Sequence, residues 1–213
     1  MVQPIISYPN AAISHDARIL QDIHLAHKNI AIYQRNIGAL RLELEQVVDQ
    51  EVNFKASGSI AEILNQLSTY AGSHLGSCPS LLVDVAEQLG VFQEITQVSS
   101  FRVFFATISN NMCRKFHTDV NDLRLLCSYV GPGTLWLPDE AIDHEASRDC
   151  GPREEVVIYD HLIQQAGTGE VVLLKGALYP GAHPILHRSP TIEEHGERRL
   201  LLRIDTNESV FGG

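Results

Sequence analysis

The sequence of 213 residues lacks the features of several large classes of protein. It has no run of about 18 consecutive apolar residues, so no membrane-spanning helix is expected. Basic residues are few: 16 Lys and Arg stand against 26 Asp and Glu, and the formal net charge of −10 opposes binding to nucleic acid or to an acidic membrane. The first residues contain early prolines and no basic segment, so we expect no secretory signal and a cytoplasmic location.

Cysteine is also sparse, and its four residues form no CxxC pair. This spacing excludes a zinc ribbon and a thioredoxin-type motif, so reduced and mostly structural thiols are expected. The sequence contains no P-loop, no GxGxxG after a strand and no GxSxG elbow. A noncontiguous Ser/His/Asp triad stays open. With 44% hydrophobic and 20% charged residues, the composition is that of an ordinary globular protein.

The length predicts one structural unit with an elaboration rather than two full domains. Residues 1–98 are predicted to be mainly helical and to pack as an extension on the core. Residues 99–213 consist of short β-branched and aromatic runs separated by Gly and Pro, which is typical of a sandwich or barrel. We therefore predict an α+β protein with a double-stranded β-helix, or jelly-roll, core and N-terminal helices packed on one sheet.

The pattern also predicts individual elements. Helical segments are expected near residues 16–26, 40–47, 59–70 and 79–89, and strands at 29–33, 101–108, 123–130, 134–137, 156–159, 171–174, 185–188 and 198–204. Residues 138–169 are interpreted as an acidic loop insertion, which is either a cover over the mouth of the barrel or a solvated connector.

The strongest local motif is an HxD pair, His117 and Asp119, which lies between the first two predicted strands of the core. The pair alone is weak, because about half an occurrence is expected by chance from ten histidines. On an extended segment, residues two apart point to the same side, so both can reach one metal ion. His187 follows later, just before the turn into the last strand. Two imidazoles and one carboxylate in this order match the facial triad of non-haem iron oxygenases.

These residues also have simpler interpretations. His117 and Asp119 would suit a turn histidine and a capping aspartate. His183 is a second candidate for the distal ligand, but it lies in a turn between Gly and Pro, so His187 is preferred. Cys113 alternates with His117 and is interpreted as a small buried thiol. A closed four-ligand zinc site would recruit His183 or Cys113 as the fourth ligand.

The last predicted strand contains three arginines, Arg198, Arg199 and Arg203. Alternation places Arg199 and Arg203 on one face with Asp205, and Arg198 on the other. Helices covering the apolar face would leave Arg199 and Arg203 toward the interior. A guanidinium binds a carboxylate through two parallel hydrogen bonds, so each arginine is a candidate anion ligand, with ordinary ion pairs as the alternative. Tyr129 is a further candidate donor to a carboxylate, with core packing as its alternative.

The motifs FHTD, LRLLC, YVGPGT, HRSP and RRLLLRID follow one another between residues 116 and 205 and together resemble a bacterial family of unknown function. Members of that family often lie beside genes for zinc-responsive metal-chaperone GTPases, which implies a functional link to those proteins. More remotely, the same motifs are similar to the Fe(II)/2-oxoglutarate dioxygenase superfamily.

The superfamily resemblance implies an oxygenase that hydroxylates an unknown small-molecule or protein substrate. The three predicted ligands would hold Fe(II), and 2-oxoglutarate would be the cosubstrate. Arg199 or Arg198 would bind its distal carboxylate, Tyr129 would add a hydrogen bond, and Arg203 would bind an anionic substrate. The alternative is a non-catalytic jelly roll for metal homeostasis, in which the same ligands bind Zn(II). A cupin-like enzyme that uses the metal without 2-oxoglutarate is the third hypothesis.

Overall fold

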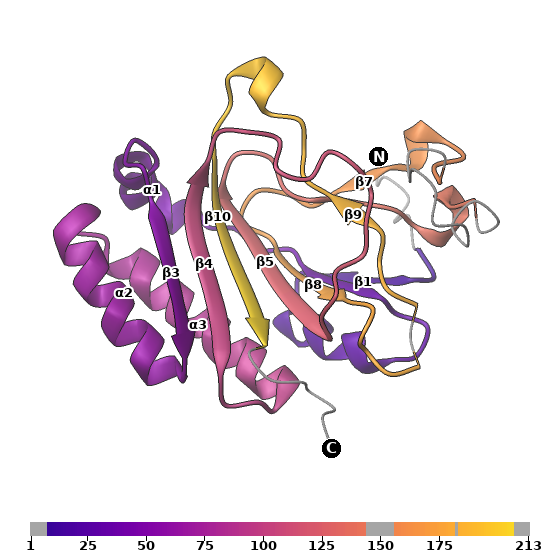
Figure 1. Cartoon of the computed structure of the whole chain (residues 1–213), viewed down its shortest axis with the longest axis horizontal. Helices are drawn as coiled ribbons and strands as arrows, with labels where there is room; N and C mark the ends of the chain where they lie inside the picture. Colours follow the sequence, from indigo (N-terminus) through magenta and orange to yellow (C-terminus); the bar gives the residue numbers. More distant parts are fainter. Residues whose placement is uncertain (1–7, 144–155, 182, 207–213) are drawn as a thin grey trace.

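Two β-sheets enclose part of the hydrophobic core in the computed structural model, which describes residues 8–143, 156–181 and 183–206. The larger sheet has seven strands in the order β1-β2-β8-β5-β10-β4-β3, and the smaller has the order β7-β6-β9 (Figure 1). The strands are β1 (Ala11–Ser14), β2 (Ile30–Tyr33), β3 (Asn53–Gly58), β4 (Phe101–Ile108), β5 (Leu123–Val130), β6 (Leu135–Trp136), β7 (Gln164–Gln165), β8 (Val171–Lys175), β9 (His187–Arg188) and β10 (Arg199–Thr206).

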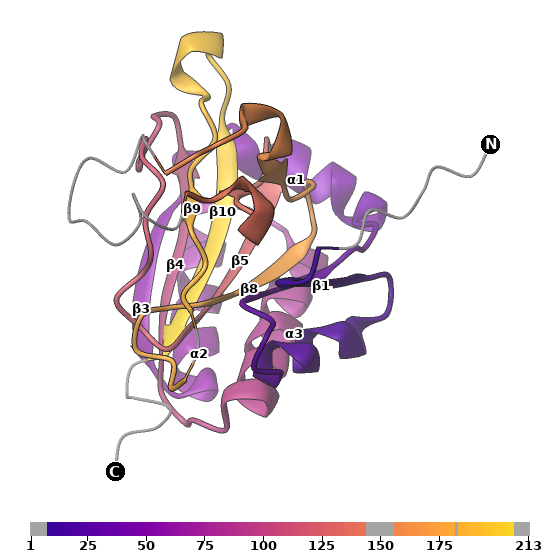
Figure 2. The same ribbon diagram turned by 90° about the vertical axis from the view of Figure 1, so that its right-hand side faces the viewer.

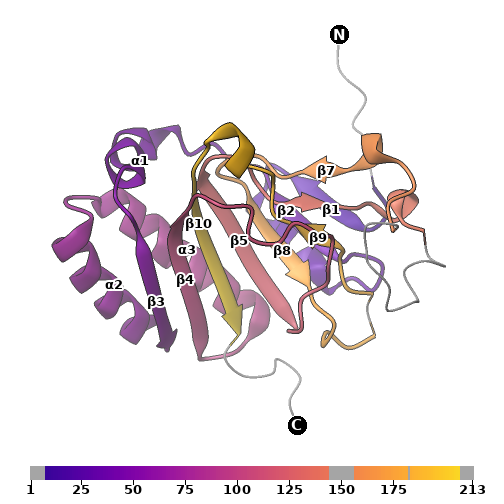
Figure 3. The ribbon, with the colours of Figure 1, turned by 45° about the horizontal axis from the view of Figure 1, so that its top comes forward.

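The C-terminal strands are arranged as a jelly roll, as predicted. β4, β10, β5 and β8 are neighbouring antiparallel strands of the large sheet. The opposing layer consists of the segment at His117, which pairs with β9 at His187, followed by β6 and β7. Figure 3 shows β7 and β9 on the side of the large sheet that is opposite to α2 and α3. The space between the layers is filled by apolar side chains from both, including Trp136 and Leu201.

The N-terminal region supplies both helices and strands. α1 (Arg41–Val48), α2 (Ile60–His74) and α3 (Pro79–Thr96) accompany a 3-10 helix, η1 (Ala17–His24), which lies against β1 and β2 (Figure 2). The sequence predicted a strand at 29–33, but β1 and β3 are additional edge strands of the large sheet. Each is short and presents small or polar residues, so neither stands out from its neighbours as an apolar alternating run.

The helices begin where local chemistry favours it. Ser59 caps α2 in a reciprocal capping box with Glu62, and Pro79 occupies the first turn of α3. α2 buries Ile63, Leu67 and Ala71, which follow the helical repeat along one face. Buried side chains of both helices form one core with the outward face of the large sheet, so the predicted packing of helices on one sheet is present.

Both faces of the final strand, β10, are apolar because each face is covered. Leu200, Leu202 and Ile204 belong to the core beneath the helices, whereas Leu201 belongs to the core between the sheets. A strand covered on both faces needs apolar residues at consecutive positions. On the face between the sheets, positions 199 and 203 have arginine rather than an apolar residue. Arg199 and Arg203 are therefore exceptions to the apolar pattern of this strand.

Residues 138–169 differ from the expected strand pattern. Residues 156–159 form no regular strand, and Val157 makes only an isolated bridge with Ile142. The segment contains two 3-10 turns, η3 (Asp139–Ala141) and η4 (Asp160–Leu162), as well as β7, while residues 144–155 lie outside the described part. Its described ends are not a solvated connector, because Ile142 and Val156 pack in a small apolar cluster with Phe116 and Leu186. Across the described residues, none of the helices combines the length and apolarity needed to cross a membrane.

Candidate metal centre

The two predicted histidine ligands are brought together by a backbone bridge. The amide of each donates to the carbonyl of the other, His117 to His187 and the reverse, both at 3.0 Å. Their ring centroids are 4.6 Å apart. Two residues after His117, the backbone carbonyl of Asp119 accepts a hydrogen bond from the amide of Ala177 at 2.8 Å. The bridge explains how segments distant in the sequence contribute to one cluster.

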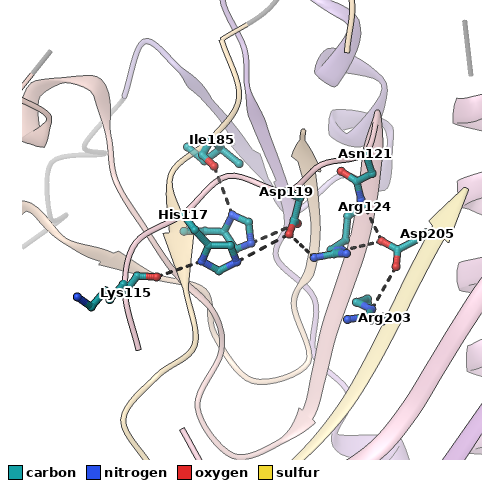
Figure 4. Close-up of polar contacts among 9 residues, drawn as sticks. Lys115, His117, Asp119, Asn121, Arg124, Ile185, Arg203 and Asp205 are labelled. Atoms are coloured by element: carbon teal, nitrogen blue, oxygen red, sulfur yellow. Dashed lines mark hydrogen bonds and ion pairs between the residues drawn. The ribbon is translucent and has the colours of Figure 1, made fainter. Parts of the chain in front are cut away.

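His117, Asp119 and His187 each offer one ligand atom, and these atoms lie within 4.8 Å of one another. The Nε2 atom of His117 is 3.8 Å from Oδ1 of Asp119, and Nε2 of His187 is 3.3 Å from Oδ2. Figure 4 shows His117 and Asp119 pointing toward each other. Asp119 and His187 are buried, whereas His117 is partly exposed, so the cluster has one accessible side.

Backbone carbonyls fix the orientation of both imidazoles. Nδ1 of His117 lies 3.0 Å from the carbonyl oxygen of Lys115 (Figure 4), and Nδ1 of His187 lies 3.3 Å from that of Ile185. Because a carbonyl can only accept, Nδ1 of each ring carries the proton and Nε2 presents its lone pair to the cluster. This is the arrangement that orients a metal-binding histidine.

The Asp119 carboxylate has one occupied oxygen and one unsatisfied oxygen. Arg124 contacts Oδ1 at 2.5 Å (Figure 4). Oδ2 is buried and has no hydrogen-bond partner, although Nε2 of His187 lies 3.3 Å away. An unsatisfied buried carboxylate oxygen is costly unless a cation binds it. The donor set therefore fits a divalent metal ion, with Oδ2 as the free ligand atom.

The pKa shifts favour the forms that bind metal. Burial lowers the pKa of His117, and the neighbouring His187 lowers it further. Burial alone would raise the pKa of Asp119, but contact with His187 and the charge of Arg124 hold it below its usual value. At neutral pH His117 is thus neutral and Asp119 ionised, as metal binding requires.

A chain of charged side chains connects the cluster to β10. Arg124, which holds Asp119, also contacts Oδ1 of Asp205 through Nε at 2.6 Å. Asn121 donates to the same Oδ1 at 3.1 Å, and Nε of Arg203 lies 3.2 Å from Oδ2 (Figure 4). Sequence reasoning did not find this chain. Alternation along β10 predicts that Arg203 and Asp205 share a face. The register between β5 and β10, which places Arg124 opposite Asp205, completes the chain.

The three candidate arginines occupy different environments. Arg199 is 1% exposed and faces the space between the sheets, where its Nη2 donates to the Ser128 hydroxyl at 2.9 Å. Its Nε has no hydrogen-bond partner, and burial lowers its pKa to about 10, so it stays charged at neutral pH. Arg203 is half-buried on the same face of β10. Arg198 is exposed and lies just before the strand.

Tyr129 is not part of this cluster. It faces the helices, where its hydroxyl donates to Oδ2 of Asp84 on α3 at 2.5 Å, so the predicted contact with a cosubstrate carboxylate does not fit the structure. Cys113 is exposed rather than a small buried thiol. His183 is exposed in its turn and lines a pocket of about 470 Å³ next to the HxD segment, together with Thr118.

The fold and the cluster define the class as a jelly-roll protein with a candidate metal centre. A family model described as "Protein of unknown function (DUF1826)" matches residues 14–205, and the chain belongs to this family. The predicted membership of a family of unknown function is thus confirmed. No curated protein matches the chain.

Similar solved structures include oxygenases of low sequence identity. The dioxygenase for auxin oxidation 1 from Arabidopsis thaliana, solved with 2-oxoglutarate, is 9% identical with a TM-score of 0.47, over 94% of this chain and 92% of that chain. A prolyl-4-hydroxylase from Pseudomonas putida is 10% identical with a TM-score of 0.43, over 89% and 97% of the two chains. The strand order described above, rather than these likenesses, defines the jelly roll.

Proposed function

We propose that the protein is an Fe(II)/2-oxoglutarate-dependent oxygenase. The observation that supports this best is the open cluster of His117, Asp119 and His187 in the same jelly roll as a buried, incompletely paired arginine, Arg199. Two imidazoles and one carboxylate suit Fe(II) and leave coordination positions free. When bound, Fe(II) and 2-oxoglutarate would activate dioxygen, which is the oxidant: one oxygen atom would hydroxylate a C–H bond and the other would convert 2-oxoglutarate to succinate and carbon dioxide.

The protein's own residues orient and enclose these groups. The carbonyls of Lys115 and Ile185 hold the two imidazoles, and Arg124 holds Oδ1 of Asp119, so that Oδ2 would be the oxygen available to a metal ion. The apolar cluster that includes Phe116 and Leu186 flanks the histidine bridge and limits the access of water.

Arg199 is the proposed ligand of the distal cosubstrate carboxylate. No carboxylate of the described residues forms an ion pair with it, and its nearest polar partner is the neutral Ser128 hydroxyl. A buried guanidinium with a free donor is stabilised by an anionic ligand that pairs with it. Arg198 is the less suitable candidate, because it is exposed to solvent.

The test is an anaerobic titration of metal-free protein with Fe(II) and then 2-oxoglutarate, following the visible iron-to-ketoacid charge-transfer band. We expect a band that needs both components, disappears in His117→Ala, and requires much more 2-oxoglutarate in Arg199→Gln. Arg198→Gln is the matched control and should resemble the wild type. Absence of the band, together with tight one-to-one zinc binding, would contradict the proposal.

A zinc-binding or metal-trafficking role, and the link to metal-chaperone GTPases, stay predictions. Within the described residues the cluster contains three donors, and neither Cys113 nor His183 joins it. Structural zinc sites usually have four protein ligands, so the three-donor cluster fits an open site better.

A further inference from the structure

A basic groove of about 530 Å³ lies over β3, β4 and β10. Strand register places Lys55, Phe104 and Arg203 in one row across the three strands. Arg102 lies in the next row, between Ser57 and Asp205. Paired residues of antiparallel strands share a face, so these side chains lie on the face that also bears the metal centre. We call this surface, formed by Lys55, Ser57, Arg102, Phe104 and Arg203, the basic groove.

The positive charge of the groove contrasts with the rest of the molecule. The chain has a formal net charge of −10, yet Lys55, Arg102 and Arg203 converge here. Lys55 Nζ and Arg203 Cζ lie 5.6 Å and 5.2 Å from the centroid of the Phe104 ring. A ring contacted by two cations holds them near one another without neutralising either.

The carboxylate next to the groove is already shared. Asp205 accepts contacts from Arg124, Asn121 and Arg203, so one negative charge serves two guanidinium groups. Arg102 donates to a backbone carbonyl, that of Thr206, at 3.3 Å. Neither Lys55 nor Arg102 has an ion-pair partner among the described residues. Among the residues that the structure describes, the groove therefore has more positive than negative charge.

The charge of Arg203 is only partly compensated by the protein. Its Nε is buried and makes no well-directed hydrogen bond, although Asp205 lies 3.2 Å away. Burial lowers the pKa of Arg203, and the charges of Arg124 and Arg102 lower it further. An anion near the guanidinium would relieve both effects.

We infer that the basic groove binds the carboxylate or phosphate group of an anionic substrate. The inference rests on the proposed oxygenase function and adds a substrate class to it. The chain of contacts from Arg203 through Asp205 and Arg124 to Asp119 makes the groove adjacent to the metal centre. Arg203 and Arg199 are separated by about 13 Å along β10, at about 3.3 Å per residue, so the two arginines serve separate anionic groups.

Binding is tested in metal-free protein with phenyl phosphate and benzoate, with benzyl alcohol as the uncharged probe. Affinities are measured by NMR chemical-shift titration of the isotope-labelled protein. We expect the two anions, but not the alcohol, to shift resonances of Lys55, Arg102 and Arg203. Lys55→Gln and Arg102→Gln should each weaken phenyl phosphate binding by about tenfold, the effect of losing one charge-assisted contact. Arg41→Gln, which removes an equal charge from exposed α1, should have no effect.

Unchanged affinity in both groove variants would overturn the inference, provided that their thermal unfolding matches the wild type. Displacement of phenyl phosphate from the groove by 2-oxoglutarate would also overturn it, because the groove would then be the cosubstrate site. The titration requires neither iron nor cosubstrate. A missing charge-transfer band would therefore contradict the proposed function alone, and a missing anion titration would contradict the groove alone.

Discussion

Arg124 shows how one side chain determines which oxygen of a ligand is available. It occupies Oδ1 of Asp119 and leaves Oδ2 unsatisfied, 3.3 Å from Nε2 of His187. Asp205 holds Arg124 in turn, because its Oδ1 atom accepts from both Arg124 and Asn121. The geometry of the metal ligand therefore depends on residues of the second layer around it.

Replacing Arg124 should weaken metal binding without removing a ligand. We expect Arg124→Gln to reduce the affinity for Co(II), used as an air-stable probe, by about tenfold or more, because Asp119 loses its orienting cation. Arg124→Lys should recover part of the affinity, since it restores the charge but not the planar fork that reaches both aspartates. Competition titration against a chromophoric chelator measures both. Equal affinities in all three proteins would contradict the assigned positioning role.

At the scale of elements, α3 and β5 are joined by a buried polar network on the helical side of the sheet. Arg35 pairs with Asp84 through both guanidinium branches, at 2.6 Å and 2.9 Å, and Nε of Arg35 donates to the carbonyl of Gly169 at 2.8 Å. Tyr129 donates to the same carboxylate. Asp84 is therefore a buried charge whose two partners, Arg35 and Tyr129, come from two different segments.

Breaking this pair should be strongly destabilising. Arg35→Met leaves the Asp84 charge buried without its cation, and we expect the free energy of unfolding to fall by about 3–5 kcal/mol. Adding Asp84→Leu should restore part of the loss, because it removes the unpaired charge but leaves the Tyr129 hydroxyl without its acceptor. Urea unfolding of the single and double variants measures the difference. A single variant as stable as the wild type would show that water reaches Asp84 and replaces Arg35.

The elements themselves were predictable to different degrees. Apart from β7, the jelly-roll strands follow from apolar runs in the sequence, and the helices α1, α2 and α3 follow from their apolar periodicity. β1 and β3 do not, because a short edge strand is stabilised by its neighbours rather than by its own pattern. The HxD motif and the shared face of Arg199 and Arg203 could be predicted from the local sequence. The face of the sheet on which Tyr129 lies could not be predicted. Alternation shows only which residues of a strand share a face, whereas the position of the helices decides which face lies between the sheets.

On the scale of the whole molecule, the metal centre exists only when the two layers are assembled. His117 and Asp119 precede β5, whereas His187 belongs to β9, and the bridge between the histidines forms with the small sheet. A ligand that binds the folded form and not the unfolded chain adds to stability by mass action. Metal binding at this candidate site would therefore be coupled to the closure of the barrel.

Metal should accordingly raise the thermal midpoint. At a free metal concentration about 100-fold above its dissociation constant, the gain is about 2.7 kcal/mol. Differential scanning calorimetry with and without Fe(II) or Co(II) under anaerobic conditions measures it, with His187→Ala as the variant that should show no gain. An equal rise in that variant would place the stabilising metal elsewhere on the chain.

The central position of β10 constrains the order in which the strands of the large sheet can pair. β10 lies between β5 and β4, so the strand that begins the jelly roll and the strand that follows the HxD motif do not pair with each other. The large sheet can therefore close only after β10 has been translated, because until then one edge of β4 and one edge of β5 lack the strand that joins them.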